Sequence, residues 1–416
     1  MQSELSIPLD IPDVEVLAVK LSKNKEYTIT VESKLNRATC RGCGREISKF
    51  HSHDRTIRLR HLPILGHKVY IELRPKRYEC PDCSSKEHRK ISTQQLRWYQ
   101  ARSTHTKAYE EQVLLELVNS TIQDVSRKED LGYDAVVGVV KRRIATQVDW
   151  FSLDRIGVLG LDEIALKKGH KDFIVIVTAR LSDHQVKVLA VLPDRKKETI
   201  KAFLRRIPTR LKRTIHTVCT DMWSAYINAA KEELEHSMVV VDRYHVAKKY
   251  RDGADQVRKQ EGKRLKRELS KVEYETIKGV MWPYRKKQAD LKPHENQLLD
   301  RFFAYSPDAK LAYHYREKLT TIFDKNLTKS QAAQEIKDWR QEVEASELTC
   351  FDPFLNTLDT HWEEITNYFV HRDTSGFVEG INNKIKVLKR RCYGLLKIDH
   401  LFQRLFLDFE GYALFA

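Results

Sequence analysis

The chain has 416 residues, with 74 Lys and Arg against 58 Asp and Glu, which gives a formal net charge of +16. Hydrophobic residues make up 41% and charged residues 32%, and no apolar run approaches the roughly 20 residues of a membrane-spanning helix, which argues against a membrane protein. There is no basic N-terminal segment followed by an apolar stretch, and the Cys number seven, so the composition predicts a cytoplasmic protein without a disulfide framework.

The positive charge is concentrated in two segments. Residues 40–107 contain 16 Lys and Arg and 6 Asp and Glu, and residues 248–292 contain 15 and 7. The remainder of the chain is close to neutral. A single basic run is often only a solvated helix face, but two concentrated blocks favour separate contacts with nucleic acid.

The first 150 residues divide into a strand-rich part and a helical part. Strand-like segments cover residues 15–21, 27–33 and 67–80. Residues 104–148 have helical periodicity, with two short helices on either side of Gly132. The second of these helices ends in Lys141, Arg142 and Arg143, so the pair predicts a DNA-binding helix-turn-helix, with an ordinary helical hairpin as the alternative.

Two Cys-x-x-Cys motifs lie in the strand-rich part, Cys40 with Cys43 and Cys80 with Cys83. This spacing lets both sulfurs of a pair reach one tetrahedral zinc ion. Four protein ligands leave no open position, so the predicted zinc site is structural. His51 and His53 are alternative ligands that we expect to have surface or packing roles instead, and a redox role for the Cys is the weaker interpretation.

From residue 156 the periodicity becomes that of an α/β domain. Strands are predicted over residues 156–166, 173–181, 185–194, 215–221 and 237–246, and helices over 198–207 and 222–234. Three successive strands followed by helix, strand, helix and strand predict a sheet of mixed direction. From about Ala247 to the end the sequence is nearly all helical.

Two Asp residues are out of place in this apolar sheet. Asp162 lies within the first strand, and Asp221 ends the strand at 215–221. A buried carboxylate is costly unless it is paired or binds a metal. Alone, each would be a cap or turn residue; together they predict a divalent metal site. Glu163 follows Asp162 and is expected to face the other side of the strand.

A third carboxylate is predicted from the C-terminal helix around residues 375–394. Its apolar positions Phe377, Ile381, Ile385 and Leu388 share one face, whereas Glu379, Lys386 and Arg390 lie on a polar face. If the apolar face packs on the sheet, Glu379 can lie beside the two Asp, with Lys386 and Arg390 placed for DNA phosphates. Glu363 and Glu364 are the fallback third ligands.

The motifs in this order resemble the ISL3 family of bacterial insertion-sequence transposases. The resemblance is carried by the paired Cys motifs, the helix-turn-helix and the segments LDEIALKKGH, VCTDMWSAY, VDRYHVAK and GFVEGINNKIKVLKRRCYG, over nearly the whole chain. It implies an RNase-H-like mixed-sheet core with an Asp-Asp-Glu triad on Asp162, Asp221 and Glu379. Asp242 and His245 match an auxiliary motif of related superfamilies.

The resemblance also implies a function. The protein would be a DDE-type transposase that binds the terminal inverted repeats, cleaves the element ends and joins the 3′-OH to target DNA, as a homodimer on DNA within the bacterial cell. Its cofactors would be structural Zn²⁺ and two catalytic Mg²⁺ or Mn²⁺ ions. A non-catalytic DNA-binding regulator and an RNase-H-like nuclease without strand transfer are the alternatives.

Five domains are expected on this interpretation. They are a zinc-binding domain (1–100), a helix-turn-helix domain (101–150), the first part of the catalytic core (151–246), a basic helical insertion (247–361) and the C-terminal helices of the core with the third carboxylate (362–416).

Overall fold

The computed structural model describes residues 8–85, 87–165, 173–181, 185–374, 376–392 and 397–416, with the side chains of 377–379 outside the description. The chain divides into two compact units. The first comprises Met1–Ala145 with Phe406–Ala416, and the second comprises Thr146–Leu405. In the described residues, no helix has both the length and the apolar composition to cross a membrane.

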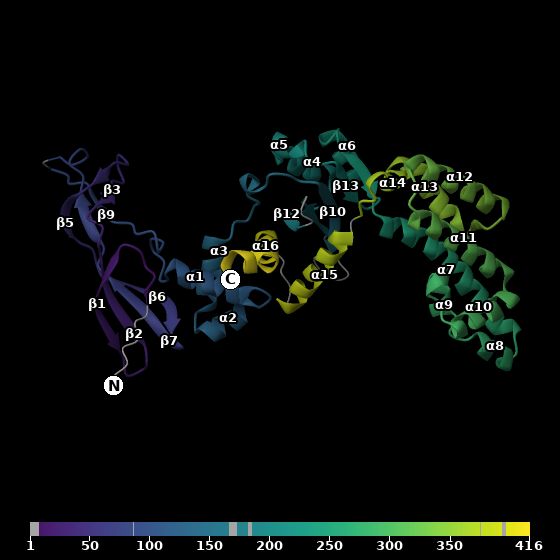
Figure 1. Cartoon of the computed structure of the whole chain (residues 1–416), viewed down its shortest axis with the longest axis horizontal. Helices are drawn as coiled ribbons and strands as arrows, with labels where there is room; N and C mark the ends of the chain where they lie inside the picture. The colour runs from purple at the N-terminus through teal and green to yellow at the C-terminus, as the bar shows by residue number, and fades with distance from the viewer. Residues whose placement is uncertain (1–7, 86, 166–172, 182–184, 375, 393–396) are drawn as a thin grey trace. The chain divides into compact units, whose positions relative to one another are not determined.

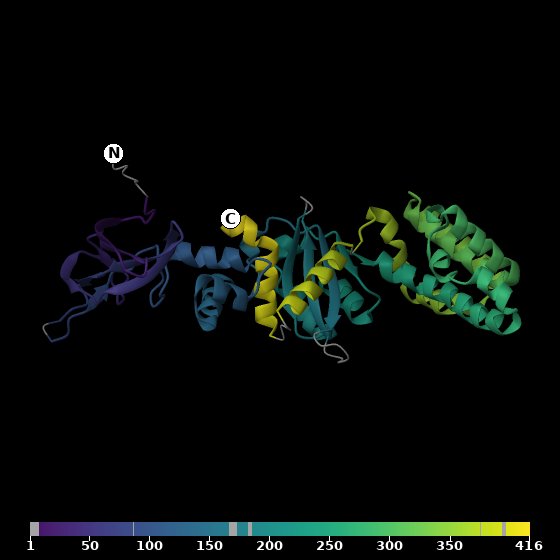
Figure 2. The same cartoon turned by 90° about the horizontal axis from the view of Figure 1, so that it is seen from below.

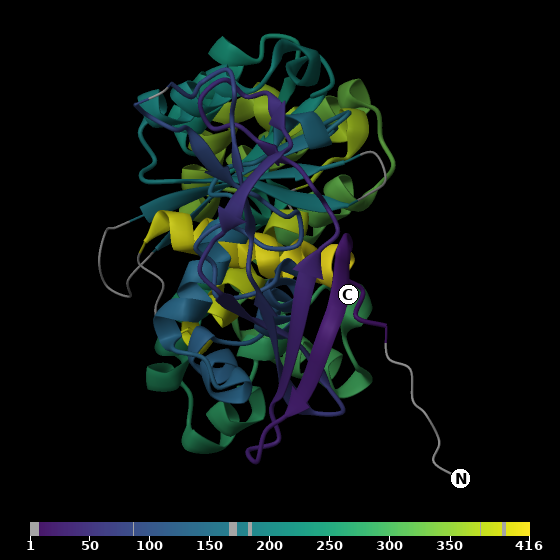
Figure 3. The same ribbon diagram turned by 90° about the vertical axis from the view of Figure 1, so that its left-hand side faces the viewer.

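The first unit begins with a four-stranded sheet in the order β1-β2-β7-β6. Its strands are β1 (Val14–Leu21), β2 (Tyr27–Ser33), β6 (Ile57–Ile64) and β7 (His67–Leu73), and the antiparallel β1–β2 pair is drawn in purple in Figure 3. Alternate residues of β2 and β7, including Ile29, Val31 and Ile71, are buried in its core. The periodicity of these strands is therefore that of a sheet with one covered face.

Two small sheets carry the Cys pairs. They are formed by β3 (Ala38–Thr39) with β4 (Glu46–Ile47), and by β5 (Lys49–His53), β8 (Lys76–Glu79) and β9 (Ile91–Thr93). The single strand predicted over 67–80 is wrong, because β7 and β8 belong to different sheets. The strand pairing is interrupted at Pro75, because proline has no N–H to donate to a ladder hydrogen bond.

Three helices complete the first unit and confirm the predicted helix pair. They are α1 (Lys107–Leu117), α2 (Ile122–Glu129) and α3 (Tyr133–Arg143). Thr121 caps α2 by accepting a hydrogen bond from the Asp124 N–H at 3.0 Å. The apolar faces of the three helices share a core that includes Leu407 of the last helix, α16 (Ile398–Phe415).

The second unit is built on a five-stranded sheet in the order β12-β11-β10-β13-β14. Figure 1 labels three of its strands, β10, β12 and β13. The strands are β10 (Val158–Ala165), β11 (Phe173–Arg180), β12 (Val186–Leu192), β13 (Thr217–Thr220) and β14 (Met238–Val241). β10–β12 pair antiparallel, whereas β10, β13 and β14 pair parallel. The mixed sheet of an RNase-H-like core is thus confirmed.

Helices cover this sheet. α4 (Lys197–Arg206) and α6 (Ser224–Glu233) pack against each other, and the short α5 (Thr209–Lys212) follows α4. The helix α15 (Gly376–Arg391) lies across the strands in Figure 2 and contacts β10. Ile381, Ile385 and Leu388 of α15 are buried, which confirms the predicted apolar face.

The remaining helices follow β14. The predicted strand 237–246 is too long, because the Asp242 carboxylate accepts a hydrogen bond from the Tyr244 N–H at 3.2 Å and caps a helix there. The helices are α7 (Arg243–Glu268), α8 (Lys271–Ile277), α9 (Met281–Arg285), α10 (Pro293–Tyr305), α11 (Pro307–Asp324), α12 (Lys329–Ala345), α13 (Asp352–Thr366) and α14 (Tyr368–His371). Their apolar residues are continuous with the core under the sheet.

Candidate active site and zinc cluster

The four Cys of the paired motifs converge, as their spacing predicts. The sulfurs of Cys40, Cys43, Cys80 and Cys83 all lie within 4.8 Å of one another. Cys40 Sγ is 4.0 Å from Cys83 Sγ, and Cys43 Sγ is 3.8 Å from Cys80 Sγ. Four sulfurs bound tetrahedrally at about 2.3 Å from zinc would lie roughly 3.8 Å apart, so the cluster fits this ion.

The backbone of the first Cys pair favours a thiolate. The N–H groups of Cys43 and Gly42 lower the pKa of Cys40 to about 6, and the Gly42 nitrogen is 3.3 Å from Cys40 Sγ. His51 and His53 lie outside the cluster: His51 Nδ1 is 2.9 Å from Ser52 Oγ, and His53 lies 3.9 Å from Glu32. This agrees with the packing and surface roles expected for them.

The strand register brings the two predicted Asp together. Leu161 of β10 pairs with Thr220 of β13, and Thr220 pairs with Val241 of β14. In each of the three strands the residue that follows is an acid. Asp162, Asp221 and Asp242 therefore form one row where the parallel pairing ends. Residues in register on parallel strands share a face of the sheet. Asp162 and Asp221 are therefore neighbours.

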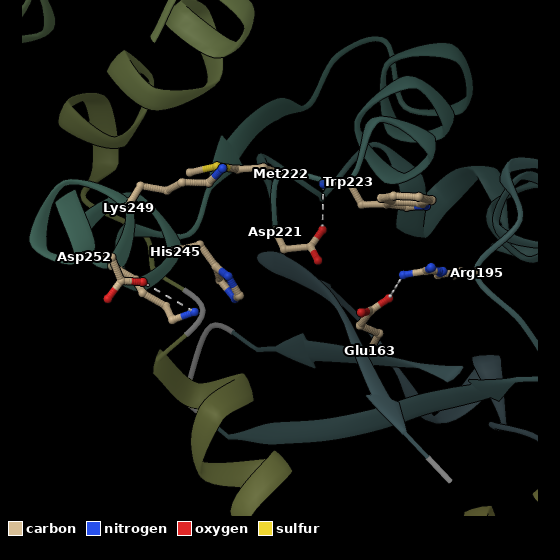
Figure 4. A pocket seen from close by; sticks show the side chains of 9 residues that line it. Glu163, Arg195, Asp221, Met222, Trp223, His245, Lys249 and Asp252 are labelled. Carbon is tan, nitrogen blue, oxygen red and sulfur yellow. Dashed lines mark hydrogen bonds and ion pairs between the residues drawn. The ribbon is translucent and has the colours of Figure 1, made fainter. Parts of the chain in front are cut away.

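Burial shapes the electrostatics of this pair. Partial burial is the main cause that raises the pKa of both Asp162 and Asp221, and the carboxylates of neighbouring acids act in the same direction; the pKa of Asp221 reaches about 6. His245 on the first turn of α7 opposes this effect for both Asp. Figure 4 shows His245 and Asp221 beside the same cavity. Two crowded, half-buried carboxylates are typical of a site completed by a cation.

Asn382 of α15 is a site residue that sequence reasoning missed. Its Nδ2 donates a hydrogen bond to Asp162 Oδ2, and the Glu163 N–H donates to Asp162 Oδ1 at 2.7 Å, so both oxygens of this carboxylate are oriented. Asn382 is only 8% exposed, yet its Oδ1 has no hydrogen-bond partner in the described part of the chain. An orphaned oxygen beside two acids is suited to a hard cation, which supports a fit to Mg²⁺.

The third carboxylate is only partly described. Glu379 lies in α15, but its side chain falls outside the described residues. Both fallback acids on α13 are engaged elsewhere, since Glu363 is 2.5 Å from Lys329 and Glu364 pairs with Lys231. Glu163 lines the cavity beside Asp221, at the part of β10 that continues past the end of β13.

The auxiliary and basic residues have different surroundings. Asp242 is buried and caps α7, and His245 lines the cavity. Lys386 and Arg390 are exposed on α15 and, with Asn382, line a second cavity of about 530 Å³. In the first unit, Arg142 pairs with Glu110 at 2.6 Å and Arg143 with Glu111, whereas Lys141 is exposed.

A match to a family model gives the class of this protein, which is a DNA-processing transposase. A family model described as "Transposase" matches residues 159–405, so the chain belongs to the ISL3 transposases. The zinc-finger model of the IS204, IS1001, IS1096 and IS1165 transposases matches residues 36–83, and the helix-turn-helix model of the ISL3 family matches residues 94–144. The zinc cluster and the helix pair thus coincide with the zinc-finger and helix-turn-helix modules of the family.

Individual relatives agree with the family. The transposase of insertion sequence IS1001 from Bordetella parapertussis is 27% identical over 379 residues, covering 90% of this chain and 89% of that protein. The transposase of IS1557 from Mycobacterium tuberculosis (strain CDC 1551 / Oshkosh) is 21% identical over 402 residues, covering 90% and 87%. A solved Drosophila P element transposase strand transfer complex covers 74% of this chain and 92% of that chain, with 10% identity and a TM-score of 0.42.

Removing the second Cys pair tests the zinc cluster. We expect the double variant Cys80→Ser, Cys83→Ser to lose bound zinc. We also expect lower thermal stability of the two small sheets that carry the Cys pairs, because a structural zinc site contributes folding energy directly. Metal analysis of the purified protein checks this, with Cys392→Ser as the control because Cys392 lies outside the cluster. Equal zinc content in the wild type, the double Cys variant and Cys392→Ser would rule the cluster out as the metal site.

The raised pKa of Asp221 predicts a pH-dependent stability. Because its folded-state pKa of about 6 exceeds the ordinary 3.8, ionising Asp221 costs the folded state on the order of 3 kcal/mol, a cost absent below pH 3.8 and complete above pH 6. In EDTA, Asp221→Asn should therefore raise the Tm by several degrees at neutral pH, and by progressively less as the pH falls towards 3.8.

Thermal melting across this pH range measures the difference. Saturating Mg²⁺ should stabilise the wild type more than the variant, because ligand binding to the folded state adds to its stability. A variant that melts below the wild type in EDTA at neutral pH would contradict the assignment of Asp221 as a strained, half-buried acid.

Proposed function

We propose that this transposase cleaves the ends of its insertion sequence and joins the resulting 3′-OH to target DNA. The observation that carries the proposal is the row formed by Asp162 and Asp221 at the ends of parallel strands, with Asn382 of α15 hydrogen-bonded to Asp162. Oxygen ligands of this kind select Mg²⁺ or Mn²⁺ rather than zinc. Two such ions, when bound, would activate the attacking hydroxyl and stabilise the leaving oxygen of a phosphodiester.

Glu379 is the third ligand in this proposal. It precedes Asn382 by three residues, so the two positions lie on neighbouring turns of the same side of α15. Since Asn382 faces Asp162, position 379 lies on the side of α15 that faces the same end of the sheet. The buried stripe of Ile381, Ile385 and Leu388 holds the helix in this orientation.

Asn382 acts as a positioning residue. Its amide and the Glu163 N–H hold the two oxygens of Asp162, which would be a ligand of the ions in this proposal. This fixes the rotamer of a half-buried carboxylate before a cation arrives. Metal-ligating carboxylates depend on such hydrogen bonds from neighbouring residues for their orientation.

The proposal includes DNA contacts in both units of the chain. Lys386 and Arg390 on α15 bind phosphates next to the scissile bond, and His245 positions water or substrate there. Lys141 of α3, with the zinc module, reads the terminal inverted repeats, whereas Arg142 and Arg143 act mainly by holding α3 on α1. The helical segment 247–361 is proposed as an insertion domain that covers DNA, and two copies of the chain bring two ends together.

A strand-transfer assay separates the proposal from its alternatives. Labelled DNA ends are incubated with target plasmid and Mg²⁺. Binding, cleavage and joined products are expected for a transposase. A regulator would give binding alone, and a nuclease would give cleavage without joining.

Substitutions at Asp162 and Asn382 test the residue roles. Asp162→Asn should retain end binding and lose cleavage by at least about a hundredfold, because a ligand of both ions is removed. Asn382→Ala should weaken Mn²⁺ binding, measured by calorimetry or electron paramagnetic resonance, by roughly tenfold to a hundredfold. Asn383→Ala is the matched control, because Asn383 is exposed on the same helix. Undiminished cleavage by Asp162→Asn would remove this residue from the site.

A further inference from the structure

The cavity beside Asp221 has a wall that metal binding does not explain. Its volume is about 480 Å³, within the roughly 300–1,000 Å³ typical of small-molecule sites. Besides Asp221, the lining residues are Glu163, Arg195, Met222, Trp223, His245, Lys248, Lys249 and Asp252, and Figure 4 labels all of these except Lys248. An aromatic ring and several cations thus lie directly next to a carboxylate of the candidate active site.

Trp223 is held at the cavity although it is not part of the core. Its side chain is 41% exposed, an unusual position for the largest apolar residue. The backbone N–H of Trp223 donates a hydrogen bond to Asp221 Oδ1 at 2.9 Å, which fixes the backbone from which the ring projects beside Asp221. The Arg195 guanidinium lies 4.3 Å from the ring centroid and supports the indole by a cation–π contact.

Arg195 is itself fixed from two other sides. It donates a hydrogen bond to Glu163 Oε2 at 3.0 Å, and its guanidinium lies 4.6 Å from the centroid of the Phe173 ring. Glu163, Arg195 and Trp223 therefore form a connected platform whose geometry exists before a ligand binds. Such pre-organisation lowers the entropy lost on binding.

The facing wall carries positive charge. Lys248 and Lys249 extend from α7 and are exposed. Lys248 is 3.8 Å from Asp252, but both side chains are more than half exposed, so this pair contributes little and leaves the ammonium available for a phosphate. A stacking ring opposite cations is the combination that proteins use to bind single-stranded nucleic acid.

We infer that this cavity captures one unpaired nucleobase of the DNA strand adjacent to the scissile phosphate, with the base stacked on Trp223 and the neighbouring phosphates on Lys248 and Lys249. The inference rests on the proposed function, which places the scissile phosphate at Asp162 and Asp221. A base within a duplex has both faces covered by its neighbours, so only a base that has left the stack can meet the indole. Glu163 lies at the same wall and can accept a hydrogen bond from a base amino group.

Binding to single-stranded and duplex DNA tests the inference without catalysis. The probes are a labelled oligonucleotide of about 20 nucleotides containing 2-aminopurine, and the same strand paired in a duplex, both in EDTA. We expect Trp223→Ala to weaken single-strand binding roughly tenfold and to abolish quenching of 2-aminopurine, and to leave duplex binding unchanged. Trp223→Phe, which keeps an aromatic face, should retain most of the affinity.

Trp282 provides the matched control. It is 65% exposed on α9 and does not line the cavity, so Trp282→Ala should bind both probes like the wild type. The inference is overturned if Trp223→Ala binds single strands normally, if it loses duplex binding equally, or if Trp282→Ala has the same effect. Thermal melting of each variant verifies that the variant is folded. If Trp223→Ala does not fold, the test is the single-strand affinity of Trp223→Phe, which should stay close to that of the wild type.

A further arm of the experiment, with free dAMP as the probe, identifies the source of the base. Tighter Trp223-dependent binding of free dAMP than of the oligonucleotide would overturn the inference in favour of a soluble nucleotide. Because the probes are bound in EDTA, the result is independent of the proposed chemistry. A wild type that captures 2-aminopurine but never cleaves DNA in Mg²⁺ would refute the proposed function and leave the nucleobase site supported.

Discussion

The parallel alignment of β10, β13 and β14 is the constraint on which the candidate active site depends. Strand pairing in register brings Asp162 and Asp221 to adjacent positions at the end of an apolar sheet. There the partial desolvation of the two carboxylates raises the pKa of each, and the negative charge of Asp162 contributes to the raised pKa of Asp221. Such an arrangement costs stability, and a bound cation is the simplest way to offset that cost. The remaining features of the site, Asn382 on α15 and His245 on α7, are arranged around this pair.

The concentrated charge of the sequence acquires different meanings in the structure. Much of the basic surplus in α7 and the following helices takes part in local ion pairs, such as Asp255 with Arg258 and Arg285. The basic residues nearest the acids are a small subset, namely Arg195 and the cations on α15 and at the start of α7. Net charge therefore indicates a polyanionic partner, whereas the position of individual cations indicates where the strand can lie.

The hydrophobic periodicity of the sequence and the spacing of its motifs predict much of this fold. The strands around Asp162 and Asp221, the α2–α3 pair and the convergence of four Cys follow from local patterns, since hydrophobic alternation, Gly132 and the Cys-x-x-Cys spacing are all readable in the chain. The end of β14 was misplaced because Asp242, read as a strand residue, is a helix cap. An N-cap acid directly before a helical run was the available signal.

The missed residues depend on contacts between distant segments. Asn382 meets Asp162 across 220 residues, and Arg195 connects Glu163 with Trp223 through side-chain geometry that no sequence period encodes. Strand alternation alone placed Glu163 away from the acids, but it could not show that β10 extends beyond β13. Local patterns thus predict elements, whereas the site arises where their ends meet.

In the proposed function, Asp162, Asp221 and a ligand from α15 hold divalent ions for DNA cleavage. Anomalous diffraction from crystals of the protein soaked with Mn²⁺ locates these ions. We expect Mn²⁺ bound by oxygens of Asp162 and Asp221, with α15 completing the coordination through Glu379. Mn²⁺ bound elsewhere, with these two carboxylates free of metal at saturating concentration, would contradict the proposal.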